Sequence, residues 1–385
     1  MGLAAIVCLL VFAGFCLQKE RKKLVLLGLA VGAIAFLYTG VYQLLRFAPY
    51  QALAGTGQMA TGTVTKLEEY STDDRRVTIA LSKVAGKEIK PRCKVFVEDR
   101  EDLPIHVGDT LEMWIELRGF DENTDVMSFK SQGVSLLGYI QALFHVESPT
   151  GLNLAGRLDA LREKLAAGQI AHLSRENAGF ARSLLFGDKT KLELSIREAF
   201  RSAGLSHVLA VSGLHLTILS QFALLFFTAV GLGRKKAVYL SLLLVLLFVG
   251  LCGFTASATR AGIMLTIYHL GSCLKRQGDP YTSLAFAGLI MVLPNPYYVR
   301  DLGLMLSFGA LLGILLFAKP IEAFIMRLIG DHKKGRCAHF FLSLFSQSLG
   351  AIAGTLPMTI FLFGSFPLLA PLANVVVVPL IQPAL

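Results

Sequence analysis

The chain has 385 residues, of which 54% are hydrophobic and 17% charged, and its mean hydropathy is +0.59. This composition excludes the ordinary soluble globular class and is typical of an integral membrane protein. The formal net charge of +10 is best explained by cationic loops that face anionic lipid, and less well by a nucleic-acid surface. The six cysteines support no disulfide framework, because most of them lie in or beside apolar runs.

Apolar runs of membrane-spanning length occupy both ends of the chain. A span needs about 20 apolar residues, and two such runs assign residues 1–45 to two transmembrane helices. Residues 205–385 are almost continuously apolar and are predicted to form a polytopic transmembrane domain. The run over residues 237–274 is too long for one crossing, so we expect it to fold back around residues 253–257.

Basic loops orient these spans, because cytoplasmic loops retain Lys and Arg. If residues 19–23 (KERKK) are cytoplasmic, alternation places the other basic loops on the same side, at residues 233–236, 274–279 and 319–336. The opposite connections of the membrane half contain only Arg260 and Arg300. The asymmetry predicts a multi-pass protein with residues 46–204 on the extracytoplasmic side.

Residues 46–150 differ from the rest, because short alternating segments there are separated by Gly-, Asp- and Ser-containing turns. Period-two patterning with such turns predicts a small all-β domain of roughly five strands. We expect an OB-like β-barrel, a fold often used to bind single-stranded nucleic acid.

A local excess of basic residues lies within this otherwise acidic domain. Grooves for single-stranded DNA combine positive charge with aromatic stacking faces, which Tyr70, Phe96 and Trp114 would supply. A solvated β-face with ordinary core aromatics explains the same residues equally well. The candidate DNA-binding residues are Arg75, Arg76, Lys83, Lys87, Lys90, Arg92 and Lys94.

Residues 151–204 are predicted to form amphipathic helices, with apolar stripes over residues 154–165 and 192–203. Such helices would either lie flat on the outer membrane surface or pack as a collar over the bundle.

Polar groups interrupt the next apolar run at residues 204–220 (GLSHVLAVSGLHLTILS). Polar side chains inside a span are expensive and usually face a cavity or a neighbouring helix. We expect one helix here, with Gly213 in its interior and with His207 and His215 on one face. Hydrogen-bonded packing of the histidines, helix-end snorkelling of Arg260 and proline kinks around Asn374 are the alternatives. The candidate channel-lining residues are His207, Ser212, Gly213, His215, Arg260 and Asn374.

Residues 206–219 resemble the signature of the ComEC-type competence proteins, the inner-membrane channels for transforming DNA. The matching positions are His207, Val211, Ser212, Gly213, Leu214 and His215. Residues 185–188 (LFGD), 253–261 and 371–379 resemble further elements of that family. The order of two spans, a β insert and a polytopic domain also matches its layout.

The resemblance implies transport of single-stranded transforming DNA across the cytoplasmic (inner) membrane during natural competence, by a channel and not by an enzyme. It implies the DNA strand and the lipid bilayer as partners, with an external DNA receptor, a cytoplasmic helicase motor and a separate nuclease. Family members commonly continue into a metallo-β-lactamase-like domain, whereas this sequence stops at Leu385 within an apolar run. We therefore expect the channel domain to be truncated there.

Motifs for other chemistry are missing from the sequence. No His-x-His-x-Asp-His motif occurs, so we predict no nuclease activity, no metal site and no cofactor. No Gly-x-x-x-x-Gly-Lys-Ser/Thr loop occurs either, so the chain is not its own ATP motor.

Two other functions stay open. Ser212 with His215 suggests an intramembrane serine protease, but a nucleophile and its base must lie within hydrogen-bond reach. A spacing of three residues would bring them together only by local accident. A small-solute transporter is the second alternative, although the internal repeats common in carriers are not evident.

Overall fold

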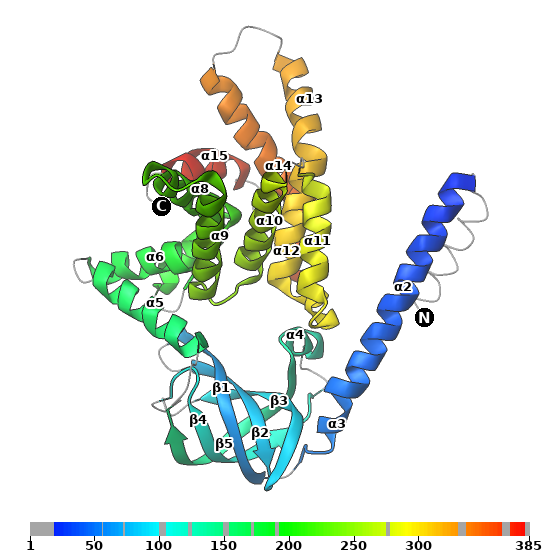
Figure 1. Cartoon of the computed structure of the whole chain (residues 1–385), viewed down its shortest axis with the longest axis vertical. Coiled ribbons are helices and arrows are strands. Elements are labelled where there is room, and N and C mark those ends of the chain that lie inside the picture. The colour runs from blue at the N-terminus through cyan, green and yellow to red at the C-terminus, as the bar shows by residue number, and fades with distance from the viewer. Residues whose placement is uncertain are drawn as a thin grey trace.

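A computed structural model places most of the chain. The residues it describes are 19–55, 57–71, 74–99, 105–121, 125–148, 154–170, 173–188, 192–274, 278–329, 336–363 and 370–381. Figure 1 shows a β-barrel at one end of the molecule, a helical bundle at the other, and the long helix α2 (Lys19–Arg46) standing to one side. The first predicted span, residues 2–17, lies outside the described residues.

Five strands form the barrel, in the ring order β1-β2-β3-β5-β4, and β4 pairs back onto β1. All neighbours are antiparallel except β3 and β5, which are parallel. The predicted alternating segments are thus strands, and each strand of the ring pairs with two neighbours. Their bounds are β1 Gly57–Ser71, β2 Asp74–Val84, β3 Lys87–Asp99, β4 Thr110–Arg118 and β5 Val134–Glu147.

The barrel core follows directly from period-two alternation. On β4 the alternate residues Leu111, Met113, Ile115 and Leu117 are fully buried, because successive side chains of a strand point to opposite faces. Gly138 on β5 allows the strands to approach closely, since a Cβ there would lie 2.7 Å from Ile115 Cδ1.

A short helix, α4 (Val126–Ser131), connects β4 with β5 and joins the barrel to the bundle. The Asn295 side-chain amide donates to the carbonyls of Lys130 (2.9 Å) and Ser131 (2.8 Å). The Tyr297 hydroxyl, from the 3₁₀ turn η1 (Pro296–Arg300), donates to Gln43 Oε1 of α2 (2.5 Å). Lys130 Nζ lies 5.3 Å from the Tyr297 ring centroid, and burial lowers the pKa of this lysine. These contacts fix the barrel and α2 to one end of the bundle.

The bundle contains the apolar helices of the second half of the chain. As predicted, the run over residues 237–274 folds back, because α9 ends at Leu251 and α10 begins at Ala256. Within the described residues, three helical stretches are long and apolar enough to cross a membrane: Gly28–Gln51, Leu302–Leu328 and Ala338–Phe361. The bundle elements are α8 Gly213–Ala229, α9 Arg234–Leu251, α10 Ala256–Cys273, α11 Pro280–Val292, α12 Leu302–Gly313, the π-helical η2 Ile314–Ala318, α13 Lys319–Ile329, α14 Arg336–Phe363 and α15 Ala370–Ile381.

The predicted amphipathic segment forms α5 (Leu154–Ile170), α6 (Arg175–Phe186) and α7 (Leu194–Ser202). Leu158 of α5 packs on α9 at Gly250, where a Cβ would lie 2.9 Å from its Cδ1. The predicted leucine stripe is only partly the buried face, because Leu161 and Leu165 are exposed and Ala166 is buried instead. The third helix, α7, buries no residue.

Candidate functional site

A cavity of about 460 Å³ lies between four helices of the bundle. Its long wall is one face of α10, where Arg260, Met264 and Tyr268 recur every four residues. At 1.5 Å rise per residue, Arg260 and Tyr268 are about 12 Å apart along the helix. The remaining lining residues are Gly213, Thr217, Ala261, Leu265, Gly278, Asp279, Pro280, Ser283 and Leu311. The cavity therefore extends along α10 from its barrel-proximal part to the loop that precedes α11.

Arg260 is a buried cation in the wall of this cavity. The residue is 9% exposed, and its Nε atom has no hydrogen-bond partner among the described residues. Asp279, the carboxylate in the described lining, already accepts from the Thr282 backbone N–H and hydroxyl, both at 2.7 Å. A buried charge without a partner is costly unless water or an anion supplies acceptors. The cavity is therefore chemically suited to an anion.

The start of α8 differs from the predicted single helix over residues 204–220. The chain forms turns before Gly213, so this glycine is the first residue of α8 and not an interior one. Ser212 has an extended backbone, and its N–H donates to His215 Nδ1 (3.2 Å), while its hydroxyl lies 2.9 Å from the same nitrogen. These contacts close the first turn, where backbone groups otherwise lack partners. The expectation that His207 and His215 share a helix face is wrong, because His207 precedes the helix.

The structure brings two of the six predicted channel-lining residues to the cavity. Arg260 lines it together with Gly213, where an added Cβ would lie 3.6 Å from Ala261 Cβ. The other four lie elsewhere. His207 is exposed, and Ser212 is half-buried at the start of α8.

His215 and Asn374 contact other helices. His215 is buried, and its Nε2 atom makes no hydrogen bond of ordinary geometry among the described residues, although it lies close to the backbone of Leu184 on α6. Asn374 on α15 donates through Nδ2 to Ser348 Oγ on α14 (2.8 Å). Both therefore act in helix packing here.

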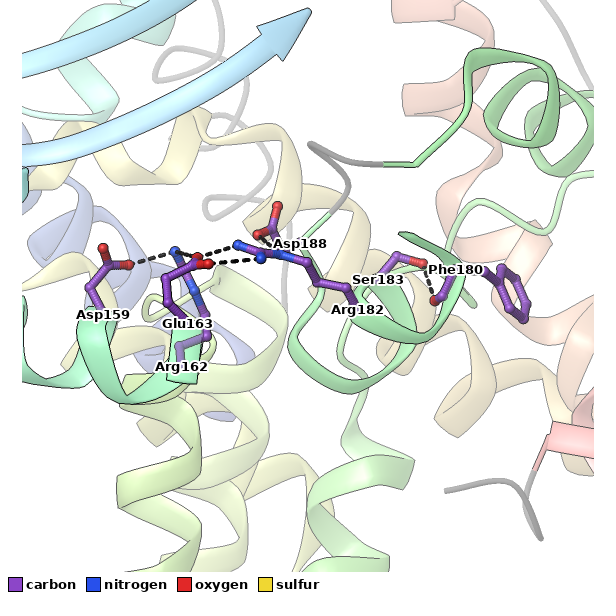
Figure 2. A network of polar contacts seen from close by, with 7 residues as sticks. All are labelled: Asp159, Arg162, Glu163, Phe180, Arg182, Ser183 and Asp188. Atoms are coloured by element: carbon purple, nitrogen blue, oxygen red, sulfur yellow. Dashed lines mark hydrogen bonds and ion pairs between the residues drawn. The ribbon is translucent and has the colours of Figure 1, made fainter. Parts of the chain in front are cut away.

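Helices α5 and α6, here called the collar helices, hold the chain just before α8. Gly187 ends α6 with φ +72°, and a Cβ there would lie 3.3 Å from Val211 Cγ2. Arg182 Nε donates to Asp188 Oδ2 (2.7 Å), and its two terminal nitrogens donate to both carboxylate oxygens of Glu163 on α5 (Figure 2). Burial lowers the pKa of Arg182, but hydrogen bonds and charge from Glu163 and Asp188 outweigh it and raise the pKa above its usual value. The LFGD segment therefore ties α5 and α6 to the start of α8.

A polar cluster inside the bundle was not predicted from the sequence. Ser220 Oγ on α8 lies 2.8 Å from His269 Nε2 on α10 and 3.3 Å from Ser241 Oγ on α9. The Ser241 hydroxyl donates to the Ser220 carbonyl (2.9 Å). The adjacent Tyr268 ring lies 5.5 Å from the His269 ring. Isolated polar residues in apolar runs are the only sequence signal for this cluster, and which of them meet depends on helix packing.

The predicted basic cluster of the barrel is divided by strand pairing. Arg75 and Arg76 on β2 stand opposite Glu69 and Glu68 on β1, and their partners on β3 are acidic as well. In the strand register, both arginines are therefore paired with acidic residues on each side.

The other basic candidates lie at different places. Lys83 and Lys87 are exposed at the opposite end of the hairpin, roughly 20 Å from Arg76 at about 3.3 Å per residue. Lys90 and Arg92 follow on β3. Lys94 is half-buried, and burial, together with Lys66 and Arg46, lowers its pKa. The seven residues thus do not form one compact patch.

The predicted stacking aromatics are also separated. Phe96 is buried and packs edge-on against Phe129, with ring centroids 5.1 Å apart. Trp114 is exposed on β4, which does not neighbour β2 in the ring. The Tyr70 side chain lies outside what the structure describes. Among the described residues, no group of three or more His, Cys, Asp or Glu side chains is placed to hold a metal ion.

Fold and cavity together define an integral membrane protein with an open cavity between its helices and a buried arginine in the cavity wall. Residues 184–385, just over half of the chain, match the family model described as "Competence protein", and the chain belongs to the competence protein family. No solved structure matches the chain significantly.

Three curated relatives carry names from DNA uptake and recombination. ComE operon protein 3 of Bacillus subtilis is 27% identical over 227 residues, which are 59% of this chain and 28% of the relative. Competence protein ComA of Neisseria gonorrhoeae is 28% identical over 279 residues, 69% of this chain and 37% of the relative. Recombination protein 2 of Haemophilus influenzae is 22% identical over 280 residues, which are 70% of this chain and 34% of the relative. The chain thus spans well under half the length of these relatives, and their names support a role in DNA uptake.

Proposed function

We propose that this chain transports single-stranded DNA across the cytoplasmic membrane during natural competence. The observation that carries the proposal is the cavity beside α10, with the buried and incompletely hydrogen-bonded Arg260 in its wall. Two segments that contribute to this wall, the start of α8 and the start of α10, lie within the competence family match.

The physical requirements of a DNA route support this assignment. Each phosphate is a charge that hydrocarbon does not tolerate, so the path needs water, cations or hydrogen-bond donors at bilayer depth. A cavity of about 460 Å³ is in the range of pockets for single small molecules. It accommodates a nucleotide-sized segment and excludes a base-paired duplex. We therefore propose one strand as the transported species.

The Ser212–His215 contact is better explained by helix capping than by catalysis. The two side chains do meet at 2.9 Å, which is within reach for a nucleophile and its base. However, His215 Nδ1 also accepts the Ser212 backbone N–H, and no carboxylate among the described residues orients its other nitrogen. We therefore propose a channel and not a protease.

The remaining assignments follow from this function. We propose that the barrel is OB-like, because five strands close in the order β1-β2-β3-β5-β4, and that it lies outside the cytoplasm with α5 to α7. The strand would come from an external DNA receptor and be drawn in by a cytoplasmic helicase motor, with a separate nuclease removing its complement. We also propose that DNA contacts the barrel through Lys83 and Lys87, because both side chains are exposed.

The test is transformation of a naturally competent host that depends on this chain. Arg260→Gln should lower transformation at least about tenfold at equal protein level, because a phosphate in the cavity loses its countercharge. Arg300→Gln is the matched control, since Arg300 is exposed on η1 and does not line the cavity, and it should transform like the parent. Normal transformation by Arg260→Gln would remove this cavity from the DNA route.

A further inference from the structure

We infer that the cavity is a subsite for single-stranded DNA, in which Arg260 holds a backbone phosphate and Tyr268 stacks on a base of another nucleotide. The inference rests on the proposed transport of single-stranded DNA and adds how the strand is held. Arg260 and Tyr268 lie on the same face of α10 and both line the cavity. The phosphate end is nearer the barrel, and the base end is nearer the loop before α11.

The phosphate end is defined by charge. Arg260 is the basic residue of the described cavity lining. It forms no ion pair with Asp279, the carboxylate of the described lining, which accepts hydrogen bonds from Thr282 at the other end of the cavity. The guanidinium fork matches phosphate geometry. Thr217 and Ser283 add hydroxyl groups to the same lining, which is appropriate for a polyanion of any sequence.

The base end is defined by a positioned aromatic ring. Tyr268 is 61% exposed, and a Cβ at Gly278 would lie 3.7 Å from its Cδ2, so the ring packs beside the loop before α11. On its other side lies His269, at an interplanar angle of 73°, and His269 is itself held by Ser220. The polar cluster thus fixes His269, whose ring contacts the Tyr268 ring edge-on.

The spacing suits a single strand. Arg260 and Tyr268 are about 12 Å apart along α10, and phosphates of one strand are about 3.4 Å apart along a stacked helix. The two residues therefore contact different nucleotides of one strand. A stretched strand has fewer nucleotides between these two contacts than a stacked strand. Stacking on an aromatic ring is tolerant of sequence, because every base has a π-face.

The experiment measures binding of fluorescent oligothymidylate and of an abasic strand of equal length to the full chain in lipid nanodiscs. Tyr268→Leu should weaken oligothymidylate binding at least about fivefold, as expected for one lost stacking contact, and should leave abasic binding unchanged. Tyr268→Phe should bind like the parent. Arg260→Gln should weaken both ligands and reduce the salt slope by about 0.7. Tyr239→Leu is the control, because Tyr239 is exposed on α9 away from the cavity.

Each other outcome counts against the subsite. Equal losses for both ligands in Tyr268→Leu would show that the ring supports the fold and not a base. Displacement by inorganic phosphate or phosphatidylglycerol with no dependence on bases would leave an anion or lipid-headgroup site only. If Tyr268→Leu and Arg260→Gln both bind DNA and support transformation like the parent, the subsite is wrong, but the proposed transport of DNA is not contradicted. If the parent neither binds single strands nor supports transformation, the proposed function itself fails.

Discussion

Gly354→Ala should prevent α12 and α14 from packing and should greatly reduce the amount of folded protein. A Cβ at Gly354 would lie 2.7 Å from Gly313 Cα and 2.9 Å from Gly313 N, and a Cβ at Gly313 would lie 2.7 Å from Gly354 Cα. These neighbours are backbone atoms, so no side-chain rotation relieves the overlap. Small residues allow such close approach of membrane helices, and overpacking typically costs about 1–3 kcal/mol or more. We expect at least about 3 kcal/mol here.

The measurement is thermal unfolding of the purified chain in detergent, followed by size-exclusion chromatography of the heated samples. Gly28→Ala in α2 is the matched control, because a Cβ there would meet no atom within 4 Å, and it should unfold at the parent's temperature. A parent-like midpoint for Gly354→Ala would show that α12 and α14 do not pack at this distance.

Arg182→Leu should destabilise the collar and release the start of α8. The side chain of Arg182 is 7% exposed and donates to Glu163 and Asp188 (Figure 2). Removing one partner of a buried ion pair typically costs about 3–5 kcal/mol, because an uncompensated charge is left behind. In this variant that charge is Asp188, whose side chain is only 10% exposed. Chemical unfolding in detergent should show the loss, and DNA uptake should fall with it.

Two variants separate the ion pair from general effects on α5 and α6. Arg157→Leu changes an exposed arginine of α5 and should keep the parent's unfolding midpoint. Arg182→Lys keeps the charge but cannot form the two-pronged contact with Glu163, so it should fall between the parent and Arg182→Leu. If Arg182→Leu unfolds like Arg157→Leu, the collar is held by apolar packing alone.

Composition and periodicity predict the layout, since both are local properties of the chain. The alternation in residues 110–118 gives the strand and its buried face without any knowledge of its neighbours. The return of the chain between α9 and α10 follows from the length of the apolar run alone. Arg260 is identified because it is a single charge within such a run.

Properties that depend on pairing are not predictable from one sequence. Acidic residues opposite Arg75 and Arg76 become visible only with the strand register. The N-cap at Ser212 makes Gly213 the first residue of α8 and not an interior one. The polar groups of Ser212 and His215 hydrogen-bond to each other at the start of the helix. The meeting of Ser220 and His269, 49 residues apart, requires the helix arrangement. The same applies to Gly313 and Gly354, whose spacing from Gly309 and Gly350 suggests close packing but does not identify the partner.

The proposed transport requires a DNA strand to pass along the α10 face of the cavity, and substituted-cysteine accessibility tests this most directly. Met264→Cys places a thiol in the cavity wall, and Leu243→Cys places one on the exposed face of α9, both with the native cysteines replaced by alanine. A charged methanethiosulfonate should modify Met264→Cys and stop DNA uptake, while uptake by Leu243→Cys should continue. Full-rate uptake with Met264→Cys completely modified would show that the DNA strand does not pass along this face of α10.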